Sequence, residues 1–339
     1  MKILGLSSKD SGCGYHRVLL PLGFMNGITG YVTNFLVEDK IEGWDAMLYN
    51  RMCPYQDKWK ETRDLLKCKI IMDLDDYWVL PPSHINSQHY EKHAQVIENN
   101  IVDADLVTVT NQALADRVRP FNSNVKILPN ALPYGFNQFI EDRRVSDRVR
   151  IFWAGGATHE ADLAMLRNPI TRLKQHKDKI QMVLGGFTDT DLMSRVIWNR
   201  MFSAFTCGGT LPYMKIHGTK PNNYMQMYEH ADIMVIPLEE SEWHACKSNL
   251  KILEAASKRI PVIVSNVAPY NEDKDLPVLW VNSQKDWFEH LNFLINNPKE
   301  RIELGNKLYE YCKEHYNIEQ VNEERYRAFE SICEVPTLS

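Results

Sequence analysis

The fold is indicated by one segment, which reads Cys246-Lys247-Ser248-Asn249-Leu250-Lys251-Ile252-Leu253-Glu254-Ala255-Ala256 and continues into Ile260-Pro261-Val262-Ile263-Val264. Its first part has the pattern of a helix with one apolar face, and its second part has the pattern of a buried strand. An earlier apolar run at residues 231–238 has the β-branched composition of another buried strand. This order of strand, loop, helix and strand predicts a parallel α/β unit. The helix would begin at the carboxyl edge of the sheet, where open sheets of this kind bind ligands.

Three charged residues would share one face of this helix, because Lys247, Lys251 and Glu254 stand at positions i, i+4 and i+7. Two ammonium groups near a helix N-terminus suit a diphosphate, since the helix end attracts anions. A carboxylate one turn further on can accept hydrogen bonds from sugar hydroxyls. The alternative is a solvent-exposed face on which Lys–Glu pairs contribute only ~0.2–0.5 kcal/mol each.

The stretch KSNLKILEAASKRIPVIVSN, residues 247–266, resembles the nucleotide-sugar segment of GT-B glycosyltransferases of the retaining family 4. The likeness is greatest to short bacterial and phage-like members. It implies that Glu254 holds the donor ribose and that its neighbours Ser248 and Asn249 face the diphosphate. The first glutamate of the family pattern would stand eight positions before Glu254, where this chain has Cys246. A role that needs a second carboxylate therefore stays open.

The composition is that of an ordinary globular protein with room for two domains. The chain has 339 residues, of which 44% are apolar and 24% charged, and a formal net charge of −5, so no overall positive field attracts nucleic acid. Seven cysteines, an odd number without a C-x-x-C pair, favour reduced thiols in the cytoplasm over disulfides or a zinc site. We expect neither a signal peptide nor a transmembrane segment, because no apolar stretch approaches ~20 residues.

The N-terminal half begins with an expected strand at residues 2–7, a glycine-rich turn at 10–17 and a helix at 18–25. The family resemblance implies that this turn faces an interdomain cleft. It makes Gly12, Gly14, His16 and Arg17 acceptor or cleft candidates, although a tight turn with exposed polar residues is the alternative. The stretches ADLVTVTNQALAD and VKILPNAL resemble the end of the first GT-B domain. Further strands are expected at 31–37, 46–50, 69–72, 105–110 and 125–128, and helices at 57–66, 87–101 and 112–118.

Three acidic residues, Asp73, Asp75 and Asp76, follow the strand expected at 69–72. They could bind a metal, contact an acceptor hydroxyl, or cap a helix. GT-B enzymes generally work without a bound metal. We therefore expect a cap or an acceptor contact, no metal site and no required cofactor.

The second domain opens with a strand at 151–154, followed by Gly155 and Gly156, whose backbone N–H groups suit a phosphate. Thr158 is the expected N-cap of the next helix. His159 could donate to a phosphate or an acceptor, or could be a surface histidine. The Arg-x4-Lys pair that many family members carry here is absent, so we expect the charge to come from Lys247 and Lys251. Later strands are expected at 180–184, 213–216 and 278–281, with helices at 191–201, 222–230 and within 284–332.

Two glycines complete the predicted donor site. Gly186 follows the strand at 180–184, and Gly218 lies where the family usually seats the nucleotide base. We therefore predict an α/β protein of the GT-B type, with two Rossmann-like doubly wound domains facing a cleft. The domains are expected at 1–145 and 146–316, and helix 317–339 could cross back to the first domain.

The predicted reaction is transfer of a sugar from a nucleotide-diphosphate donor to an acceptor hydroxyl, with retention. Lys247, Lys251 and His159 are the catalytic candidates. The resemblance favours a glycan or lipid-linked glycan as acceptor. Hydroxymethylated DNA is an alternative that would need a cleft patch from Arg17, Arg117, Arg119, Arg143, Arg144 and Arg148. A nucleotide-sugar epimerase and an inactive sugar-nucleotide-binding module also stay open as functions. The sequence does not indicate the oligomeric state.

Overall fold

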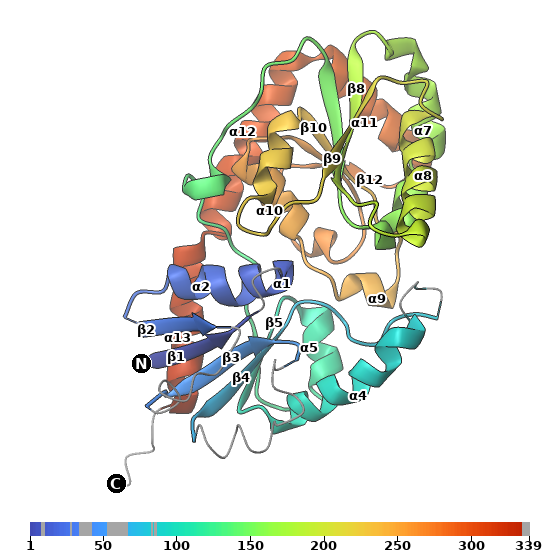
Figure 1. The fold of residues 1–339 in the computed structure, drawn as a ribbon. Helices are drawn as coiled ribbons and strands as arrows, with labels where there is room; N and C mark the ends of the chain where they lie inside the picture. Colours follow the sequence, from blue (N-terminus) through green and yellow to red (C-terminus); the bar gives the residue numbers. More distant parts are fainter. Residues whose placement is uncertain are drawn as a thin grey trace. The chain divides into compact units, whose positions relative to one another are not determined.

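The computed structural model describes residues 1–7, 11–27, 29–33, 43–52, 67–82, 84 and 87–333. They form two compact units (Figure 1). Unit 1 comprises Met1–Ala131, Ala245–Ser248 and Tyr316–Ser339; unit 2 comprises Leu132–His244 and Asn249–His315. Each unit is built on a parallel sheet of six strands.

The sheet of unit 1 has the strand order β2-β1-β3-β4-β5-β6, and every neighbouring pair is parallel. The order reverses between β1 and β3, which makes this pair the switch point of the sheet. The strands are β1 Lys2–Leu6, β2 Thr29–Thr33, β3 Ala46–Asn50, β4 Lys69–Leu74, β5 Leu106–Val109 and β6 Val125–Ile127. The helical elements of unit 1 are α1 Gly12–Gly14, the π-helix η1 Tyr15–Leu19, α2 Leu20–Gly23, α4 Ser87–Asp103, α5 Gln112–Val118 and the terminal helix α13 Ile318–Cys333. The short helix α9 Glu242–Ala245 lies where the chain passes from unit 2 to unit 1.

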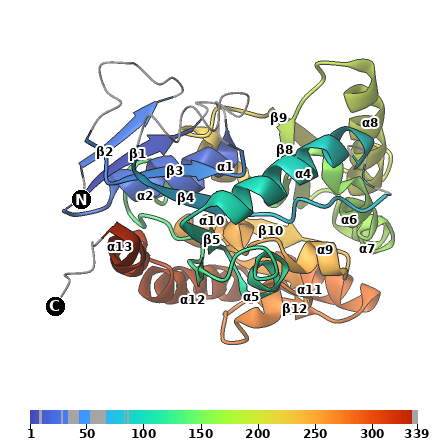
Figure 2. The ribbon, with the colours of Figure 1, turned by 90° about the horizontal axis from the view of Figure 1, so that it is seen from below.

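Helices cover both faces of this sheet because its strands are apolar on both sides. One face packs against α4 and α5. The other packs against Val18 and Leu22 of the first helical segment and against Phe329 of α13. Figure 2 shows α13, in red, beside the strands of unit 1. The terminal helix α13 and the first strand β1 therefore belong to the same hydrophobic core.

Most elements of unit 1 lie where the sequence predicts them. The strand at 46–50 and the helix at 112–118 are confirmed to the residue. The first helical segment begins earlier than expected, at Gly12, because the Ser11 side chain caps the Gly14 N–H. The glycine-rich turn is therefore largely helical. The expected helix at 57–66 and residues 34–37 of an expected strand lie outside the described residues.

The sheet of unit 2 has the order β12-β11-β10-β7-β8-β9, again all parallel. Counted within the unit, this is the strand order of a dinucleotide-binding fold, and its switch point lies between β7 and β10. The strands are β7 Val149–Ala154, β8 Ile180–Phe187, β9 Tyr213–His217, β10 Ile233–Ile236, β11 Val262–Ser265 and β12 Leu279–Val281. The α-helices are α6 Glu160–Ala164, α7 Arg167–Arg172, α8 Leu192–Thr206, α10 Leu250–Ser257, α11 Gln284–Asn296 and α12 Pro298–His315.

The core of unit 2 packs one face of this sheet against α6, α7, α8 and α11. Short 3-10 turns connect several elements: η4 Asn137–Phe139, η5 Ala157–His159, η6 Leu173–His176, η7 Tyr224–His230 and η8 Tyr270–Glu272. One expectation is wrong in detail. Gly156, not Thr158, precedes the turn η5, and Thr158 caps no helix. The helix expected at 222–230 is present as a 3-10 helix at 224–230.

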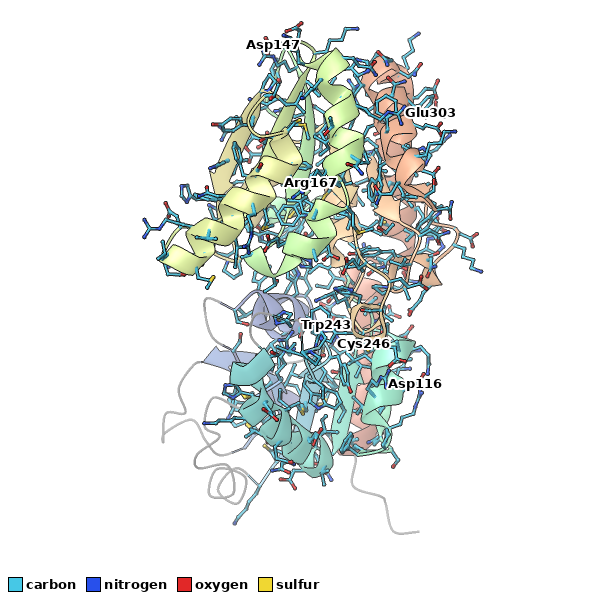
Figure 3. The ribbon with its side chains drawn as sticks, turned by 90° about the vertical axis from the view of Figure 1, so that its right-hand side faces the viewer. Asp116, Asp147, Arg167, Trp243, Cys246 and Glu303 are labelled. Atoms are coloured by element: carbon cyan, nitrogen blue, oxygen red, sulfur yellow. The ribbon has the colours of Figure 1, made fainter. Side chains whose placement is uncertain are left out.

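The helix expected at Cys246–Ala256 begins only at Leu250, with Asn249 as its N-cap. Residues 245–248 belong to unit 1 instead. Cys246 is 1% exposed in the core cluster that includes the α5 residues Leu114 and Val118. In Figure 3, Cys246 lies near α5, the helix that carries Asp116. The side chain at 246 is thus anchored in the other unit, which prevents the helix from starting there.

The division between the units falls earlier than the expected domain end at residue 145. Residues 132–145 belong to unit 2, where Tyr134 donates to the Leu253 carbonyl at 3.5 Å and Gln138 donates to the Pro221 carbonyl at 3.0 Å. Within the described part of the chain, none of the helices has the length and apolar character needed to cross a membrane.

Candidate functional site

Three glycines meet at the carboxyl edge of the unit 2 sheet. Gly155 follows β7, Gly186 lies near the end of β8, and Gly218 follows β9. A Cβ atom on Gly186 would stand 2.5 Å from the Gly155 carbonyl oxygen, and one on Gly218 would stand 3.7 Å from the Gly186 oxygen. Gly186 also has a φ of +89°, which side chains rarely adopt. The structure therefore brings these predicted residues together as a surface of bare backbone.

Backbone hydrogen bonds fix this glycine surface. The Gly155 N–H donates to the Gly185 carbonyl at 3.3 Å, and the Gly218 N–H donates to the Phe187 carbonyl at 3.0 Å. Gly156 lies beside it and is less confined, since the nearest atom to an added Cβ would be the Thr158 hydroxyl at 3.9 Å. At Gly155 the position of an added Cβ is already bordered by the Trp153 ring at 2.9 Å and by the His159 ring at 3.3 Å, so close packing requires glycine there.

His159 is held at the same edge by a carboxylate. Its Nδ1 lies 2.7 Å from Oδ2 of Asp162, whose Oδ1 accepts the Glu239 N–H at 2.9 Å just after β10. Burial alone would raise the pKa of Asp162, but its hydrogen bond to His159 and the charge of that ring hold it below its usual value. This arrangement fixes the imidazole and places Nε2 on the opposite edge of the ring.

Lys251 and Glu254, both on α10, do not share one exposed helix face as expected, because each contacts different aromatic side chains. The Lys251 Nζ lies 5.8 Å from the centroid of the Trp153 ring, which itself packs against Gly155. Glu254 is only 6% exposed, and its two carboxylate oxygens accept hydrogen bonds from Tyr224, at 2.6 Å, and from Tyr228. Burial raises the pKa of Glu254. The two tyrosines were not singled out in the sequence, although their spacing of four residues places both on one side of a helical turn.

Lys247 and Ser248 belong to unit 1, whereas Lys251 belongs to unit 2. The Lys247 ammonium pairs with Asp76 at 3.2 Å, and the Ser248 hydroxyl accepts from the Asn130 amide at 2.8 Å. The Asn111 amide donates to the carbonyls of residues 245 and 247. These bonds correct the expectation that Lys247 and Lys251 share one helix face.

Arg17 and Asp73 form a buried ion pair in unit 1. The guanidinium donates to both Asp73 oxygens, at 2.9 and 2.8 Å, and both residues are 1–2% exposed. It also donates to Asn130 and to the Leu128 carbonyl. Their polar atoms are thus engaged with each other, and a role for these two residues in an acceptor or cleft site stays a prediction.

The remaining residues of the first loop are mostly structural. A Cβ on Gly14 would lie 2.0 Å from the Ser7 hydroxyl, so close packing requires glycine there, whereas Gly12 has open space. His16 is buried, and burial lowers its pKa to about 4, which keeps it neutral near pH 7. The loop thus lies within the core of unit 1 more than the sequence suggests.

Asp75 and Asp76 surround a residue that the sequence analysis missed. Arg51, directly after β3, donates to Asp75 at 3.0 Å and lies 3.7 Å from Asp76. Burial would raise the pKa of Asp75, but Arg51 and further hydrogen bonds lower it to about 2. Among the described residues no cluster of metal-binding type occurs, and Asp76 accepts the Tyr77 N–H without capping a helix. The sequence could have indicated Arg51, because this residue directly follows a predicted strand.

The two units, each built on a doubly wound parallel sheet, define the chain as a protein of the GT-B fold, the class seen in its structural neighbours. Residues 148–297, which lie in unit 2, match the family model described as Glycosyl transferases group 1. No curated protein matches the sequence.

Solved structures show the same fold at low identity. A sucrose-phosphate synthase from Thermosynechococcus elongatus is 12% identical, with a TM-score of 0.71 over 98% of both chains. Anabaena HepE in complex with UDP and glucose is also 12% identical, with a TM-score of 0.69 over 98% of this chain and 100% of that one. A UDP-forming α,α-trehalose-phosphate synthase from Burkholderia xenovorans, in complex with glucose-6-phosphate, is 14% identical, with a TM-score of 0.59 over 84% and 72%.

Proposed function

We propose that unit 2 binds a nucleotide-diphosphate sugar and that the chain transfers its sugar to an acceptor hydroxyl with retention at the anomeric carbon. The observation that carries this proposal is the backbone surface of Gly155, Gly186 and Gly218 at the carboxyl edge of a dinucleotide-type sheet, beginning at β7, which borders the switch point. Such edges bind phosphorylated ligands because backbone N–H groups and helix N-termini converge there. The complexes of HepE with UDP and with UDP-glucose support the same class of donor.

The leaving diphosphate must be stabilised as the glycosidic bond breaks. We assign this role to Lys251 and to the N-terminus of α10, whose N-cap is Asn249, together with the N–H of Gly156 at the start of η5. His159 is proposed to donate to a phosphate or to the acceptor from Nε2, since Asp162 holds Nδ1. Lys247 stays a second candidate cation, although its present partner is Asp76.

Glu254 is proposed to accept from the donor ribose. Each carboxylate oxygen can accept more than one hydrogen bond, so the bond from Tyr224 to Oε1 leaves capacity for a ribose hydroxyl. The acceptor hydroxyl can lose its proton to the departing phosphate. A protein base is therefore not required, and neither a metal nor a cofactor enters the proposal.

Three of the six arginines on which the DNA alternative depended make contacts within their own units. Arg17 is buried against Asp73, Arg144 pairs with Glu229 at 3.1 Å, and Arg143 donates to the Arg259 carbonyl at 2.9 Å. These groups are engaged within their own units, so no specific observation favours a polyanionic acceptor. We propose a glycan or lipid-linked glycan as the acceptor class.

The test is turnover of a pool of nucleotide-sugars in the presence of mixed saccharide acceptors. We expect release of one nucleoside diphosphate and a product whose anomeric configuration, read by NMR, equals that of the donor. Inversion at that carbon would refute retention. A free sugar nucleotide of altered stereochemistry would indicate an epimerase, and binding without any turnover would indicate an inactive module.

Lys251→Ala provides the matched variant for this test. Loss of one group that stabilises the leaving diphosphate should lower kcat by about 100- to 1,000-fold, with a smaller change in KM. Lys274→Ala, on an exposed residue outside these contacts, is the control. Equal turnover by both variants would show that Lys251 does not act on the leaving group.

A further inference from the structure

The strand β9 forms one edge of the unit 2 sheet and, among the described strands, pairs only with β8. At its two ends, the Met182 N–H donates to the Pro212 carbonyl at 2.8 Å, and the Gly218 N–H donates to the Phe187 carbonyl at 3.0 Å. The parallel register between these two bonds directs the N–H and C=O groups of alternate residues toward β8 and away from it. One row of backbone groups on β9 therefore faces away from the sheet.

This outward row belongs to Tyr213, Lys215 and His217. Within the part of the chain that the structure describes, the outward N–H and C=O groups of these residues have no hydrogen-bond partner. All three residues are exposed. An open edge of this kind can add one further strand, because an extended peptide pairs with its free N–H and C=O groups.

Aromatic rings of α8 and β8 hold Lys215 beside this edge. The Nζ of Lys215 lies 4.2 Å from the centroid of the Phe202 ring and 5.0 Å from that of the Phe187 ring. Tyr213 contacts Phe202 edge-on at 4.4 Å between ring centroids, and His217 contacts Phe187 in the same way at 4.9 Å. Lys215 makes no hydrogen bond or ion pair with any described residue. Since cation–π contacts already order this ammonium, a carboxylate can pair with it at a small cost in side-chain entropy.

The opposite face of β9 is apolar. It carries Met214 and Ile216, whose side chains are half-buried and whose backbone groups face β8. Successive side chains of an added strand point to opposite faces. A residue placed opposite Lys215 therefore meets the ammonium, while its two neighbours lie on the face of Met214 and Ile216. This arrangement suits an extended segment with one acidic residue between two apolar residues.

A second copy of the chain suits this edge less well. Antiparallel pairing of two β9 strands over their whole length would place Lys215 directly opposite Lys215 of the second copy. Like charges in that position destabilise a sheet. A lysine on an edge strand thus opposes self-association, whereas the same lysine attracts a segment that brings a carboxylate.

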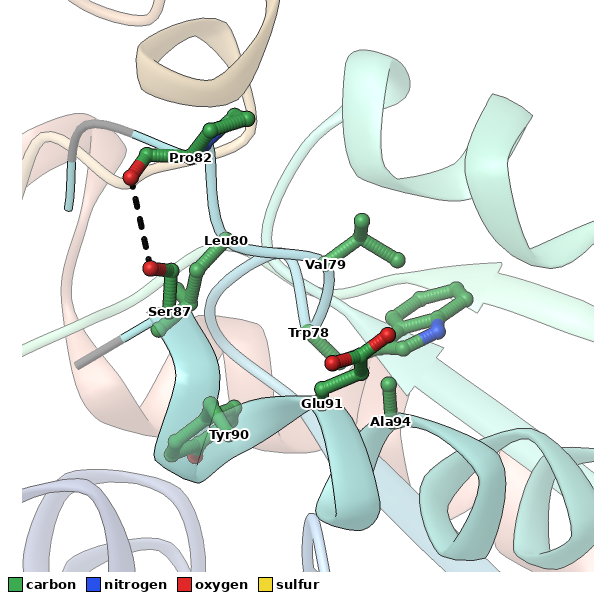
Figure 4. A pocket seen from close by; sticks show the side chains of 8 residues that line it. All are labelled: Trp78, Val79, Leu80, Pro82, Ser87, Tyr90, Glu91 and Ala94. Carbon is green, nitrogen blue, oxygen red and sulfur yellow. Dashed lines mark hydrogen bonds between the residues drawn. The ribbon is translucent and has the colours of Figure 1, made fainter.

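A pocket in unit 1 has the opposite charge preference (Figure 4). It lies between the loop after β4 and the first turns of α4, and Glu91 of α4 is exposed and lines it. Because a carboxylate repels an acidic segment, we expect this pocket to leave such a segment unbound. Helix α4 therefore provides a reference within the same molecule for binding at β9.

We propose that the outer edge of β9 binds an extended segment of a partner protein in which one acidic residue is flanked by two apolar residues. The segment adds a seventh strand to the six-stranded sheet of unit 2. Its carboxylate pairs with Lys215, and its flanking side chains lie beside Met214 and Ile216. The inference does not depend on the proposed sugar transfer.

The probe is the peptide threonine-valine-glutamate-valine-threonine, blocked at both ends and labelled for fluorescence anisotropy. A second peptide has lysine in place of glutamate. We expect the parent to bind the glutamate peptide at least about tenfold more tightly, because like charges placed opposite each other are costly. Lys215→Glu should reverse this preference, which a folding defect cannot do. Lys299→Glu makes the same charge change on an exposed residue of α12 and should keep the preference of the parent.

The contribution of the backbone is tested by Tyr213→Pro and Tyr213→Thr. Proline removes the outward N–H of residue 213 but keeps the bonds to β8, which come from its neighbours Pro212 and Met214. Threonine removes the same aromatic ring and keeps the N–H. Tyr213→Pro should therefore bind the glutamate peptide roughly three- to tenfold more weakly than Tyr213→Thr.

Hydrogen exchange read by NMR locates the bound peptide. The amides of Lys215 and His217 should exchange more slowly when the glutamate peptide is added, and the amides of α4 should not change. Protection of α4 without protection of β9 would place the peptide elsewhere. A dimer of the free protein with β9 already protected would show that a second copy covers the edge.

Three affinity results would also overturn the inference. One is equal binding of the two peptides by the parent, another is an unchanged preference in Lys215→Glu, and the third is no binding of either peptide at millimolar concentration. Donor turnover is measured on the same protein. Peptide binding without donor turnover would refute only the proposed function, and donor turnover without peptide binding would refute only this inference.

Discussion

At the scale of single residues, Gly186 is the position where the donor site tolerates least change. A Cβ there would meet the Gly155 carbonyl oxygen at 2.5 Å, in a backbone conformation that already disfavours side chains. We expect Gly186→Ala to lower affinity for nucleoside diphosphates at least tenfold, about 1.4 kcal/mol. Gly23→Ala, in α2 of unit 1, is the control, since its Cβ would meet no atom within 4 Å. Calorimetry with a panel of nucleoside diphosphates measures both, and unchanged affinity in Gly186→Ala would move the site elsewhere.

His16 gives unit 1 a dependence on pH. Because burial lowers its pKa from 6.5 to about 4, the unfolded chain takes up this proton more readily than the folded chain. The stability from neutral His16 is present above pH 6.5 and is lost as the pH falls through about 4. Over this window the free energy of unfolding should fall by roughly 3 kcal/mol.

The measurement is hydrogen exchange of peptides from β1 and β4 between pH 7 and pH 4.5, corrected for the intrinsic rate. His16→Gln should show a shallower loss of protection than the parent, because glutamine does not titrate. Parallel curves for the two proteins would contradict this assignment.

At the scale of elements, the segment 245–248 is held to unit 1 by Asn111. The side-chain oxygen Oδ1 of Asn111 caps α5 by accepting the Leu114 N–H. The side-chain NH2 of Asn111 donates to the carbonyls of Ala245 and Lys247. Asn111→Asp keeps the cap but loses both donated bonds. We expect this substitution to lower the free energy of local opening of segment 245–248 by about 1–3 kcal/mol.

Hydrogen exchange of a peptide spanning residues 243–250 tests this expectation, with peptides of α5 as an internal reference. Faster exchange in the segment with unchanged α5 is the expected result. Ser123→Asp, which adds the same charge at an exposed residue nearby, is the control. If it exchanges as fast as Asn111→Asp, the donated bonds do not hold the segment.

The contrast between α5 and α10 explains what the sequence could predict. Helix 112–118 follows from local signals: an asparagine cap and an apolar face. The start of α10 does not, since Cys246 has its partners among residues more than a hundred positions away. The glycine surface was predictable because each glycine follows a strand. The ion pair of Arg17 with Asp73 and the role of Arg51 required the order of the strands in the sheet.

At the scale of the whole molecule, the two units should respond separately to damage in α13. Phe329 is 1% exposed in the core of unit 1, so Phe329→Ala should cost about 3–5 kcal/mol there. Unit 2 contains none of these contacts. We expect unit 1 to lose stability while unit 2 still binds nucleoside diphosphate.

Differential scanning calorimetry with and without nucleoside diphosphate checks this separation. Ligand at about 100 times its dissociation constant should stabilise unit 2 by about 2.7 kcal/mol in both the parent and the variant. Arg327→Ala, on an exposed position of the same helix, serves as the control. Loss of the ligand effect in Phe329→Ala would show that the two units do not fold independently.

The placement of α13 also sets an order of events during protein synthesis. The strands of unit 1 are synthesised before Phe329, whose side chain packs against one face of their sheet. All of unit 2 is translated in between. While unit 2 is being translated, this face is covered only by the first helical segment with Val18 and Leu22, and the part that Phe329 will cover offers a binding surface to chaperones until α13 has been made.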